Sequence, residues 1–324
     1  MPECKDRVRV KFFSVSKKIL VSLLFILGVC WMGAAQNFYW ENPVTLTKTD
    51  SRFPITVSNN TGSYIFWQEI DSANRQIYLS CRKVEDLKNY TENLKFAGPF
   101  SYSGDDVPDI YTVDILDNGT VAVAAITGVS TISVFTTTNG GVSFTESKLK
   151  TSELMVAPRI YRTNANTFKL FTSLGESDSF QIYTADSKDG VTWSRLEIFA
   201  PAAPLRNPFV PVLIPYQNGD LVVFQAQYVA PDTGRFSYQL YATNRSSSNG
   251  NWSNAILISD QNSFDARSSI DFYKYQNQRA SLFQFNDETW IAWERTQAIT
   301  SNLWVGRITK DGFVPGSAEE LTSQ

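Results

Sequence analysis

The stretch Tyr-Thr-Ala-Asp-Ser-Lys-Asp-Gly-Val-Thr-Trp, residues 183–193, decides the fold because related stretches occur before and after it. An earlier copy reads "TTTNGGVSF" at 136–144, and a degenerate copy, "TNRSSSNGNW", follows at 243–252. Each copy comes directly after an apolar segment rich in β-branched and aromatic residues, so each occupies the same place in a larger unit. A period of roughly 50 residues is typical of propellers, in which each unit is one small antiparallel sheet.

The rest of the chain repeats with the same period. Proline leads the first β segment of four units, at Pro54, Pro108, Pro158 and Pro208. Turns rich in Asn, Gly and Asp follow at 58–63, 116–120, 163–167, 216–220 and 285–289, and such residues supply the positive φ that tight hairpins require. We count five units, roughly 51–104, 105–154, 155–204, 205–262 and 280–324. The pattern predicts an all-β fold, a β-propeller of four-stranded antiparallel blades, with five blades counted and six as the alternative.

Both ends of the array resemble the outer strand of a unit: "NPVTLTKTD" at 42–50 and "AEELTSQ" at the C-terminus. Two interpretations follow. Either the fifth blade shares both strands, or the chain is part of a longer array and the propeller over 36–324 is incomplete at its C-terminus.

The stretches at 137–144 and 187–193 resemble the Asp-box of sialidases and other BNR-repeat propellers. In that pattern a hydroxyl residue, an acidic or amide residue and a glycine precede an aromatic residue. The resemblance implies a structural role on the blade periphery, away from any site, because a short acceptor bonds backbone N–H groups within its own turn and the aromatic ring pins the turn to the sheet. The residues concerned are Thr137, Asn139, Gly141 and Phe144 in one copy, and Ser187, Asp189, Gly190 and Trp193 in the other.

The N-terminus is predicted to be a targeting segment. Five basic residues between Arg7 and Lys18 precede the apolar run "ILVSLLFILGVCWMGAA", and small residues allow cleavage after Ala35. Residues 1–35 are therefore predicted to be a signal peptide. The alternatives are an uncleaved membrane anchor, because the run is about 17 residues long, and a lipoprotein modified at Cys30. In each case the protein is exported, and it is secreted, periplasmic or attached to the cell envelope.

Charge and composition exclude several classes of function. Residues 1–35 hold six Lys/Arg and two Asp/Glu, so 23 basic and 30 acidic residues remain after cleavage, a net charge of −7. This argues against nucleic acid as a partner and against a membrane surface, except through an uncleaved N-terminus. The chain has no histidine, which excludes Ser-His-Asp and Cys-His catalysis and histidine metal sites. We predict no metal and no cofactor.

"SRFPI" at 51–55 resembles the Phe/Tyr-Arg-Ile-Pro motif at the start of the first sialidase blade. The resemblance implies that Arg52 binds a substrate carboxylate, which a guanidinium fork matches well. Three more arginines precede or lie on first β segments and are candidates for the same face: Arg159, Arg206 and Arg267. For each of them the alternative is a loop arginine paired with a neighbouring acid.

The catalytic carboxylates of the family are harder to place. Glu69 falls where a family acid belongs, and Asp71 is the nearest candidate for proton transfer, but the family's spacing of arginine and aspartate is not kept. The tyrosine nucleophile cannot be assigned. The sequence therefore favours an exported sialidase-like propeller that binds a glycan or a protein without catalysis. The alternatives are a sialidase-type glycoside hydrolase that uses Arg52, and a scaffold fragment of a longer surface protein.

Overall fold

The computed structural model describes residues 47, 49–84, 93–104, 106–151, 155–175, 179–229, 236–247, 250–259, 275–297 and 300–322. The chain divides into two compact units, Met1–Leu46 and Thr47–Gln324, and all described residues belong to the second. The predictions for the targeting segment and for Arg267 fall outside the described residues. Among the described residues, no helix has the length and apolar composition that crossing a membrane requires.

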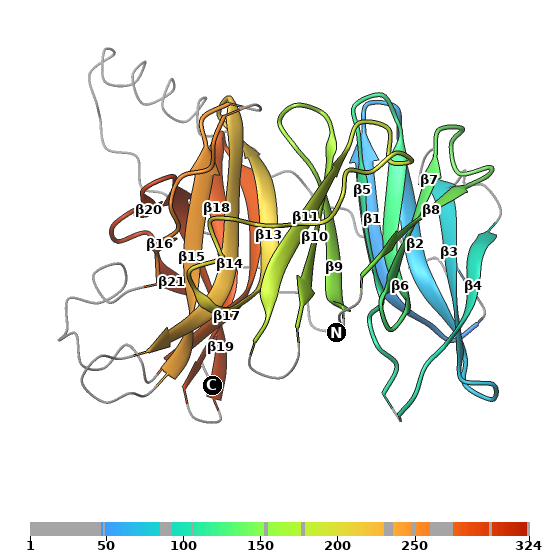
Figure 1. Ribbon diagram of the computed structural model, residues 1–324, viewed down its shortest axis with the longest axis horizontal. Coiled ribbons are helices and arrows are strands. Elements are labelled where there is room, and N and C mark those ends of the chain that lie inside the picture. The colour runs from blue at the N-terminus through green and yellow to red at the C-terminus, as the bar shows by residue number, and fades with distance from the viewer. Residues whose placement is uncertain are drawn as a thin grey trace, which may run out of the picture. The chain divides into compact units, whose positions relative to one another are not determined.

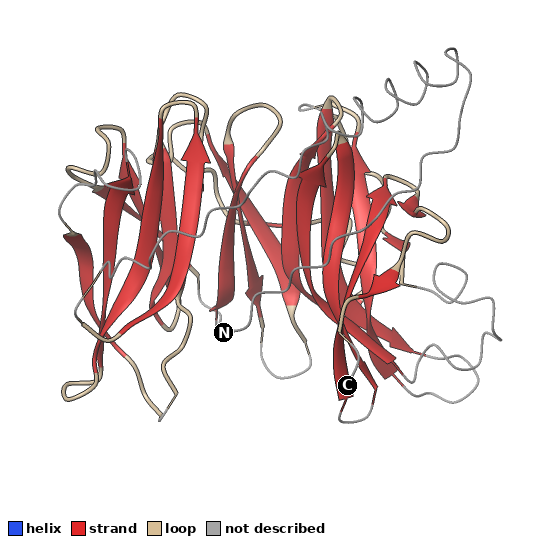
Figure 2. Cartoon of the chain, turned by 180° about the vertical axis from the view of Figure 1, so that it is seen from behind, coloured by secondary structure: helices blue, strands red, loops and turns tan. Residues whose placement is uncertain are grey.

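The described part of the chain forms five separate antiparallel sheets (Figures 1 and 2). In four sheets the strands pair in chain order from first to last, and in the fifth β17, β18, β19 and β20 do so while β21 also pairs with β19. This arrangement confirms the predicted propeller of antiparallel blades. We number the sheets as blades 1 to 5 and call β1, β5, β9, β13 and β17 the first strands.

The strand bounds show how regular the repeat is. Blade 1 consists of β1 (Ser51–Asn59), β2 (Gly62–Asp71), β3 (Gln76–Val84) and β4 (Leu94–Ser101). Blade 2 consists of β5 (Tyr111–Ile115), β6 (Val121–Gly128), β7 (Thr131–Thr137) and β8 (Thr145–Lys150), and blade 3 of β9 (Met155–Arg162), β10 (Phe168–Leu174), β11 (Gln181–Ser187) and β12 (Glu197–Ile198). Blade 4 consists of β13 (Arg206–Tyr216), β14 (Gly219–Val229), β15 (Phe236–Arg245) and β16 (Ile256–Leu257). Blade 5 consists of β17 (Tyr275–Phe285), β18 (Glu288–Gln297), β19 (Thr300–Thr309), β20 (Gly312–Phe313) and β21 (Glu319–Glu320).

The hairpin turns lie where the sequence predicts them, between the first and second strand of each blade. In blade 1 the Asn59 side-chain oxygen accepts hydrogen bonds from the backbone N–H groups of Thr61 and Gly62, at 2.8 and 3.2 Å. The Asn59 amide also donates to the Leu116 carbonyl of blade 2, at 2.6 Å. Asparagine therefore closes its own turn and ties it to the next blade.

Apolar clusters fill the space between consecutive blades. β6 shows why the second strands are so apolar: Val121, Val123 and Ala125 face blade 1, whereas Ala122 and Ala124 face blade 3. Similar clusters join blade 3 to blade 4 through Phe171 and Phe224, and blade 4 to blade 5 through Val223 and Trp293. A middle strand is buried on both faces, so its residues are apolar without alternation.

Four of the five first strands have β-bulges near their beginning. The pairing register shifts by one residue within β1, β9 and β17, and twice within β13. Four of the bulged residues have a positive φ although they are not glycine: Phe53 at 54°, Asn207 at 47°, Val210 at 50° and Arg279 at 53°. Bulges redirect side chains, and such strained residues tend to occur at functional sites.

Each blade has two edges, which we name the start edge and the turn edge. The start edge is where the first strands begin and where the second strand turns into the third. The turn edge is where the first strand turns into the second, and the stretches 137–144 and 187–193 lie there as well. Because the bulges are near the beginning of the first strands, they belong to the start edge.

Candidate functional site

Arg52 lies at the start edge, at the second position of β1. Its guanidinium bonds both carboxylate oxygens of Asp50, with Nε–Oδ1 and Nη2–Oδ2 distances of 3.4 and 3.3 Å. The side chains of Arg52 and Asp50 are 47% and 46% exposed. An exposed pair of this kind contributes little to stability, so Arg52 can exchange its partner for a ligand.

Glu69 does not share a site with Arg52. From the turn to Ile55, β1 pairs with β2 in a constant register, but the bulge at Phe53 and Pro54 shifts it by one residue. As a result Arg52 lies opposite Gln68, and Glu69 lies opposite Ser51. Opposed residues share a face and neighbours along a strand alternate, so Arg52 and Glu69 project from opposite faces of blade 1.

On its own face Glu69 is already paired. Its carboxylate lies 3.1 Å from the Lys95 ammonium, and its side chain is 11% exposed. The same ammonium lies over the Tyr78 ring, 4.0 Å from the ring centroid. This is the arrangement of a structural ion pair, on the face of blade 1 opposite Arg52.

Asp71 ends β2 at the start edge and is held by Asn74. Its two carboxylate oxygens accept hydrogen bonds from the Asn74 backbone N–H, at 3.1 Å, and from the Asn74 side-chain amide, at 2.8 Å. The Asn74 hydrogen bonds lower the pKa of Asp71. A general acid for glycoside hydrolysis needs a raised pKa, so this environment opposes the proton-donor role considered for Asp71.

The other predicted arginines occupy different blades of the start edge. Arg159 lies within β9, and its guanidinium donates to the Pro158 carbonyl at 3.3 Å. Arg206 begins β13 and is exposed. Together with Arg52, they place cationic side chains on blades 1, 3 and 4.

Asp109 is a start-edge residue that sequence reasoning missed as a site candidate. It leads into β5, and although the residue is exposed, loss of water around its carboxyl raises its pKa, against the effect of Arg159. None of the groups that shift its pKa is a second carboxylate. A loop aspartate in "SGDDVPD" gives no local signal of this environment, which arises only when blades 2 and 3 meet.

Arg279 and Glu294 form a second missed pair on blade 5. The Arg279 guanidinium lies 2.8 Å from Glu294, and the Arg279 side chain is 73% exposed. Glu294 also accepts hydrogen bonds from the hydroxyls of Ser301 and Thr296, and the Ser301 bond is the main cause that lowers its pKa. The bulge that exposes Arg279 has no signal in the sequence.

At the turn edge, the stretch 187–193 forms a self-contained hydrogen-bonded turn. The Asp189 carboxylate accepts the backbone N–H groups of Val191 and Thr192 at 2.8 and 2.7 Å, and these bonds lower its pKa, Thr192 contributing most. The Ser187 hydroxyl accepts the N–H of Gly190 at 2.8 Å, and the Trp193 indole N–H donates to the Gly190 carbonyl at 2.8 Å. All of these side chains are used within the turn or against the sheet.

The stretch 137–144 has similar bonding. The Asn139 side-chain oxygen accepts hydrogen bonds from the Thr137 hydroxyl at 2.9 Å and from the Ser143 N–H at 3.1 Å. The Thr137 hydroxyl accepts from the Gly141 N–H at 3.1 Å. Phe144 stacks on Phe96 of blade 1, with ring centroids 4.1 Å apart.

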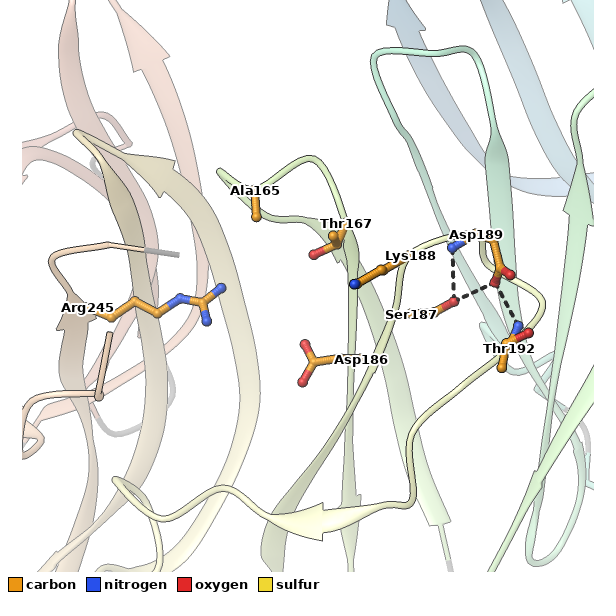
Figure 3. A pocket seen from close by; sticks show the side chains of 8 residues that line it. All are labelled: Ala165, Thr167, Asp186, Ser187, Lys188, Asp189, Thr192 and Arg245. Carbon is orange, nitrogen blue, oxygen red and sulfur yellow. Dashed lines mark hydrogen bonds between the residues drawn. The ribbon is translucent and has the colours of Figure 1, made fainter. Parts of the chain in front are cut away.

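A cavity of about 570 Å³ lies beside the turn 187–193, between blades 3 and 4 (Figure 3). Two of its charged lining residues, Asp186 and Arg245, are paired with buried residues behind the lining. Asp186 lies 2.6 Å from the buried ammonium of Lys169, and Arg245 bonds the fully buried Asp220. Burial lowers the pKa of Lys169, and Asp186 opposes that shift. We interpret these two ion pairs as structural, because each charge is already paired within its own blade.

Among the described residues, no group of three or more Cys, Asp or Glu side chains is placed to hold a metal ion.

Comparison with known proteins bears on the fold alone. No family model and no curated protein matches the chain. Solved structures do. A subtype N11 neuraminidase-like protein of A/flat-faced bat/Peru/033/2010 (H18N11) aligns with a TM-score of 0.51 and 9% identity, over 88% of this chain and 77% of that one.

Two further structures align similarly. A Penicillium chrysogenum α-L-arabinanase complexed with arabinobiose has a TM-score of 0.51 and 13% identity, over 84% of this chain and 83% of that one. A Dyadobacter fermentans protein of unknown function has a TM-score of 0.50 and 13% identity, over 85% and 83%. The chain has the propeller fold of neuraminidase-like and arabinanase structures. Whether its turns belong to the BNR family stays a prediction.

Proposed function

We propose that the chain is an exported propeller module that binds a glycan at its start edge and does not hydrolyse it. The observation that supports this most is the register shift at Phe53 and Pro54. It separates Arg52 from Glu69, and Asp71 is held by Asn74 with a lowered pKa. Glycoside hydrolases of the common kind need two carboxyl groups across one substrate, one of them with a raised pKa.

Binding needs only side chains that contact the ligand, and the start edge supplies such side chains. Arg52 has only an exposed partner, and Arg206 is exposed on another blade. Arginine donates five N–H groups and bonds to hydroxyl or carboxylate oxygens. A glycan is the ligand we favour, and a protein surface is the other kind of partner that such an edge fits. Oligomeric state does not enter this proposal.

Export is part of the proposal and rests on the basic, apolar and small-residue segments of residues 1–35. Expression of the full chain followed by N-terminal sequencing of the exported product tests it. A new terminus at Gln36 supports a signal peptide, whereas retention of the apolar run supports an anchor. A product that stays inside the cell with residues 1–35 intact contradicts export.

A sialidase-type hydrolase is the second candidate, and Asp109 is the observation that favours it, since its raised pKa suits a proton donor. The test is hydrolysis of a fluorogenic sialoside between pH 4 and pH 8 by the chain and by Arg52→Ala and Asp109→Asn. We expect no turnover above that of the buffer. Turnover that is lost in both variants would overturn the non-catalytic proposal.

A further inference from the structure

The cavity in Figure 3 lies at the turn edge, where blades 3 and 4 face each other. Lys169 and Asp186 are cross-strand partners, and they project on the same face of blade 3 as Phe171, which packs against blade 4. Asp220 and Arg245 are cross-strand partners on the face of blade 4 that meets blade 3. Opposed residues share a face and neighbours alternate, so the two ion pairs border the same space from opposite sides.

Figure 3 shows which polar groups point into this space. The Arg245 guanidinium enters it from blade 4. The Asp186 carboxylate, the Thr167 hydroxyl and the Lys188 ammonium point into it from blade 3. The volume of about 570 Å³ falls within the range of about 300–1,000 Å³ that is usual for small-molecule sites. The cavity is therefore large enough for a small polar ligand.

The charged groups of the cavity keep hydrogen-bonding capacity that their ion pairs do not use. Asp186 meets Lys169 through Oδ1, at 2.6 Å, and Arg245 bonds Asp220 through Nε and Nη2. Within the described part of the chain, no residue bonds Asp186 Oδ2, Arg245 Nη1 or the Lys188 ammonium. The cavity thus offers a ligand one charged acceptor and two charged donors.

The lining has no excess of either charge. Its acids and bases are equal in number: Asp186, Asp189, Lys188 and Arg245. A charged ligand would be repelled by one sign while it is attracted by the other, and it would compete with the existing partners of Asp186 and Arg245. A neutral ligand with several hydroxyls requires no such exchange, because each hydroxyl both donates and accepts.

We propose that this cavity is a second carbohydrate site, which takes a neutral mono- or disaccharide. One sugar hydroxyl donates to Asp186 Oδ2, and other hydroxyls accept from Arg245 Nη1 and from Lys188. Hydrogen bonds to charged groups are stronger than those between neutral groups, so these three residues hold the sugar. The inference goes beyond the function proposed above, because the cavity lies at the turn edge and uses none of the start-edge residues.

The test is acetylation of the folded chain by acetic anhydride, read by peptide mass spectrometry, with arabinobiose, lactose or 3′-sialyllactose present. At least one of the two neutral sugars should slow the modification of Lys188, by roughly half when the sugar concentration equals the Kd. Lys310, an exposed lysine of blade 5, is the internal control and should react at an unchanged rate. Sialyllactose should protect Lys188 no better than lactose.

A matched pair of variants tests the acceptor. Asp186→Asn keeps the shape of the side chain and removes its charge, so roughly tenfold more sugar should be needed for the same protection of Lys188. Glu197→Gln makes the same change at an exposed carboxylate of β12 and should leave the protection as it is. Circular dichroism at the assay temperature establishes that both variants are folded.

Saturation transfer from the chain to each sugar, recorded by NMR, separates the possible failures. Transfer to a neutral sugar without protection of Lys188 places that sugar elsewhere, and the start-edge proposal survives. Protection that Asp186→Asn leaves unchanged, or protection by sialyllactose alone, refutes a neutral site built on these groups. Absence of both transfer and protection with all three sugars at millimolar concentration contradicts this inference and the glycan-binding proposal together.

Discussion

Asp220→Ala removes one partner of the most deeply buried ion pair that the structure describes. The Asp220 side chain is fully buried, and that of Arg245 is 11% exposed. Asp220 accepts the Arg245 Nε–H at 2.6 Å and, on its other oxygen, the Asn164 N–H of blade 3 at 2.7 Å. The substitution therefore leaves a charge without its partner and also breaks a bond between two blades.

Removing one partner of a buried pair costs about 3–5 kcal/mol. Arg245 lines the cavity in Figure 3, so water can reach its guanidinium once Asp220 is gone. We therefore expect the lower end of the range, about 3 kcal/mol less free energy of unfolding. In urea, a chain of this size has a slope of at least about 3 kcal/mol per molar, so the midpoint should fall by about 1 M.

Urea unfolding followed by tryptophan fluorescence measures this shift. Asp311→Ala, in the exposed pair with Lys310, is the matched control and should leave the midpoint unchanged. Replacing both partners, with Asp220→Leu and Arg245→Met, should be less damaging than Asp220→Ala alone, because no charge is stranded. A fall below about 0.3 M for Asp220→Ala, or a double variant less stable than the single one, would refute the reasoning.

Three further predictions concern buried or half-buried side chains of blades 1 and 3. Trp193→Ala removes a half-buried ring and its hydrogen bond to Gly190, so it should lower the free energy of unfolding by about 2–3 kcal/mol. A loss below about 1 kcal/mol in urea unfolding would show that the ring does not pin its turn. The pKa of Lys169 is lowered in the folded chain, so just below pH 10.5 the unfolded chain binds more protons than the folded chain. The free energy of unfolding, measured relative to that of Lys169→Met, should therefore rise with pH in that window. A difference that falls with pH contradicts this sign. Burial raises the pKa of Cys81 to about 12. A disulfide reagent at pH 8 should therefore label Cys81 in urea and not in the folded chain. Rapid labelling of Cys81 in the folded chain would refute the burial of this thiol.

The fold could be predicted from sequence because its signals are local. Asn59 closes its hairpin with its own side chain, and the Asp189 turn is bonded within seven residues. Because the repeat is short, a turn signal of this kind recurs in every unit. The strands after each turn could therefore be placed without knowledge of distant contacts. Burial of β6 on both faces explains why its sequence does not alternate.

The site could not be predicted to the same depth, because it depends on register. If β1 continued the pairing that starts at Asn59 and Gly62, Arg52 would oppose Glu69 on one face. The bulge at Phe53 and Pro54 moves Arg52 opposite Gln68 instead. Phenylalanine gives no local signal for a positive φ, and a slip of one residue reverses every side chain that follows.

The central claim is that the start edge binds a glycan and leaves it intact, and one NMR experiment tests both halves. The folded chain is mixed with lactose and sialyllactose, saturation transfer from protein to sugar is recorded, and the anomeric signals are followed for a day. The account predicts transfer to a sugar ring and no new anomeric signals. New anomeric signals that appear only when the chain is present would show hydrolysis. Absence of transfer to both sugars would show that neither binds the chain. Either result contradicts the account.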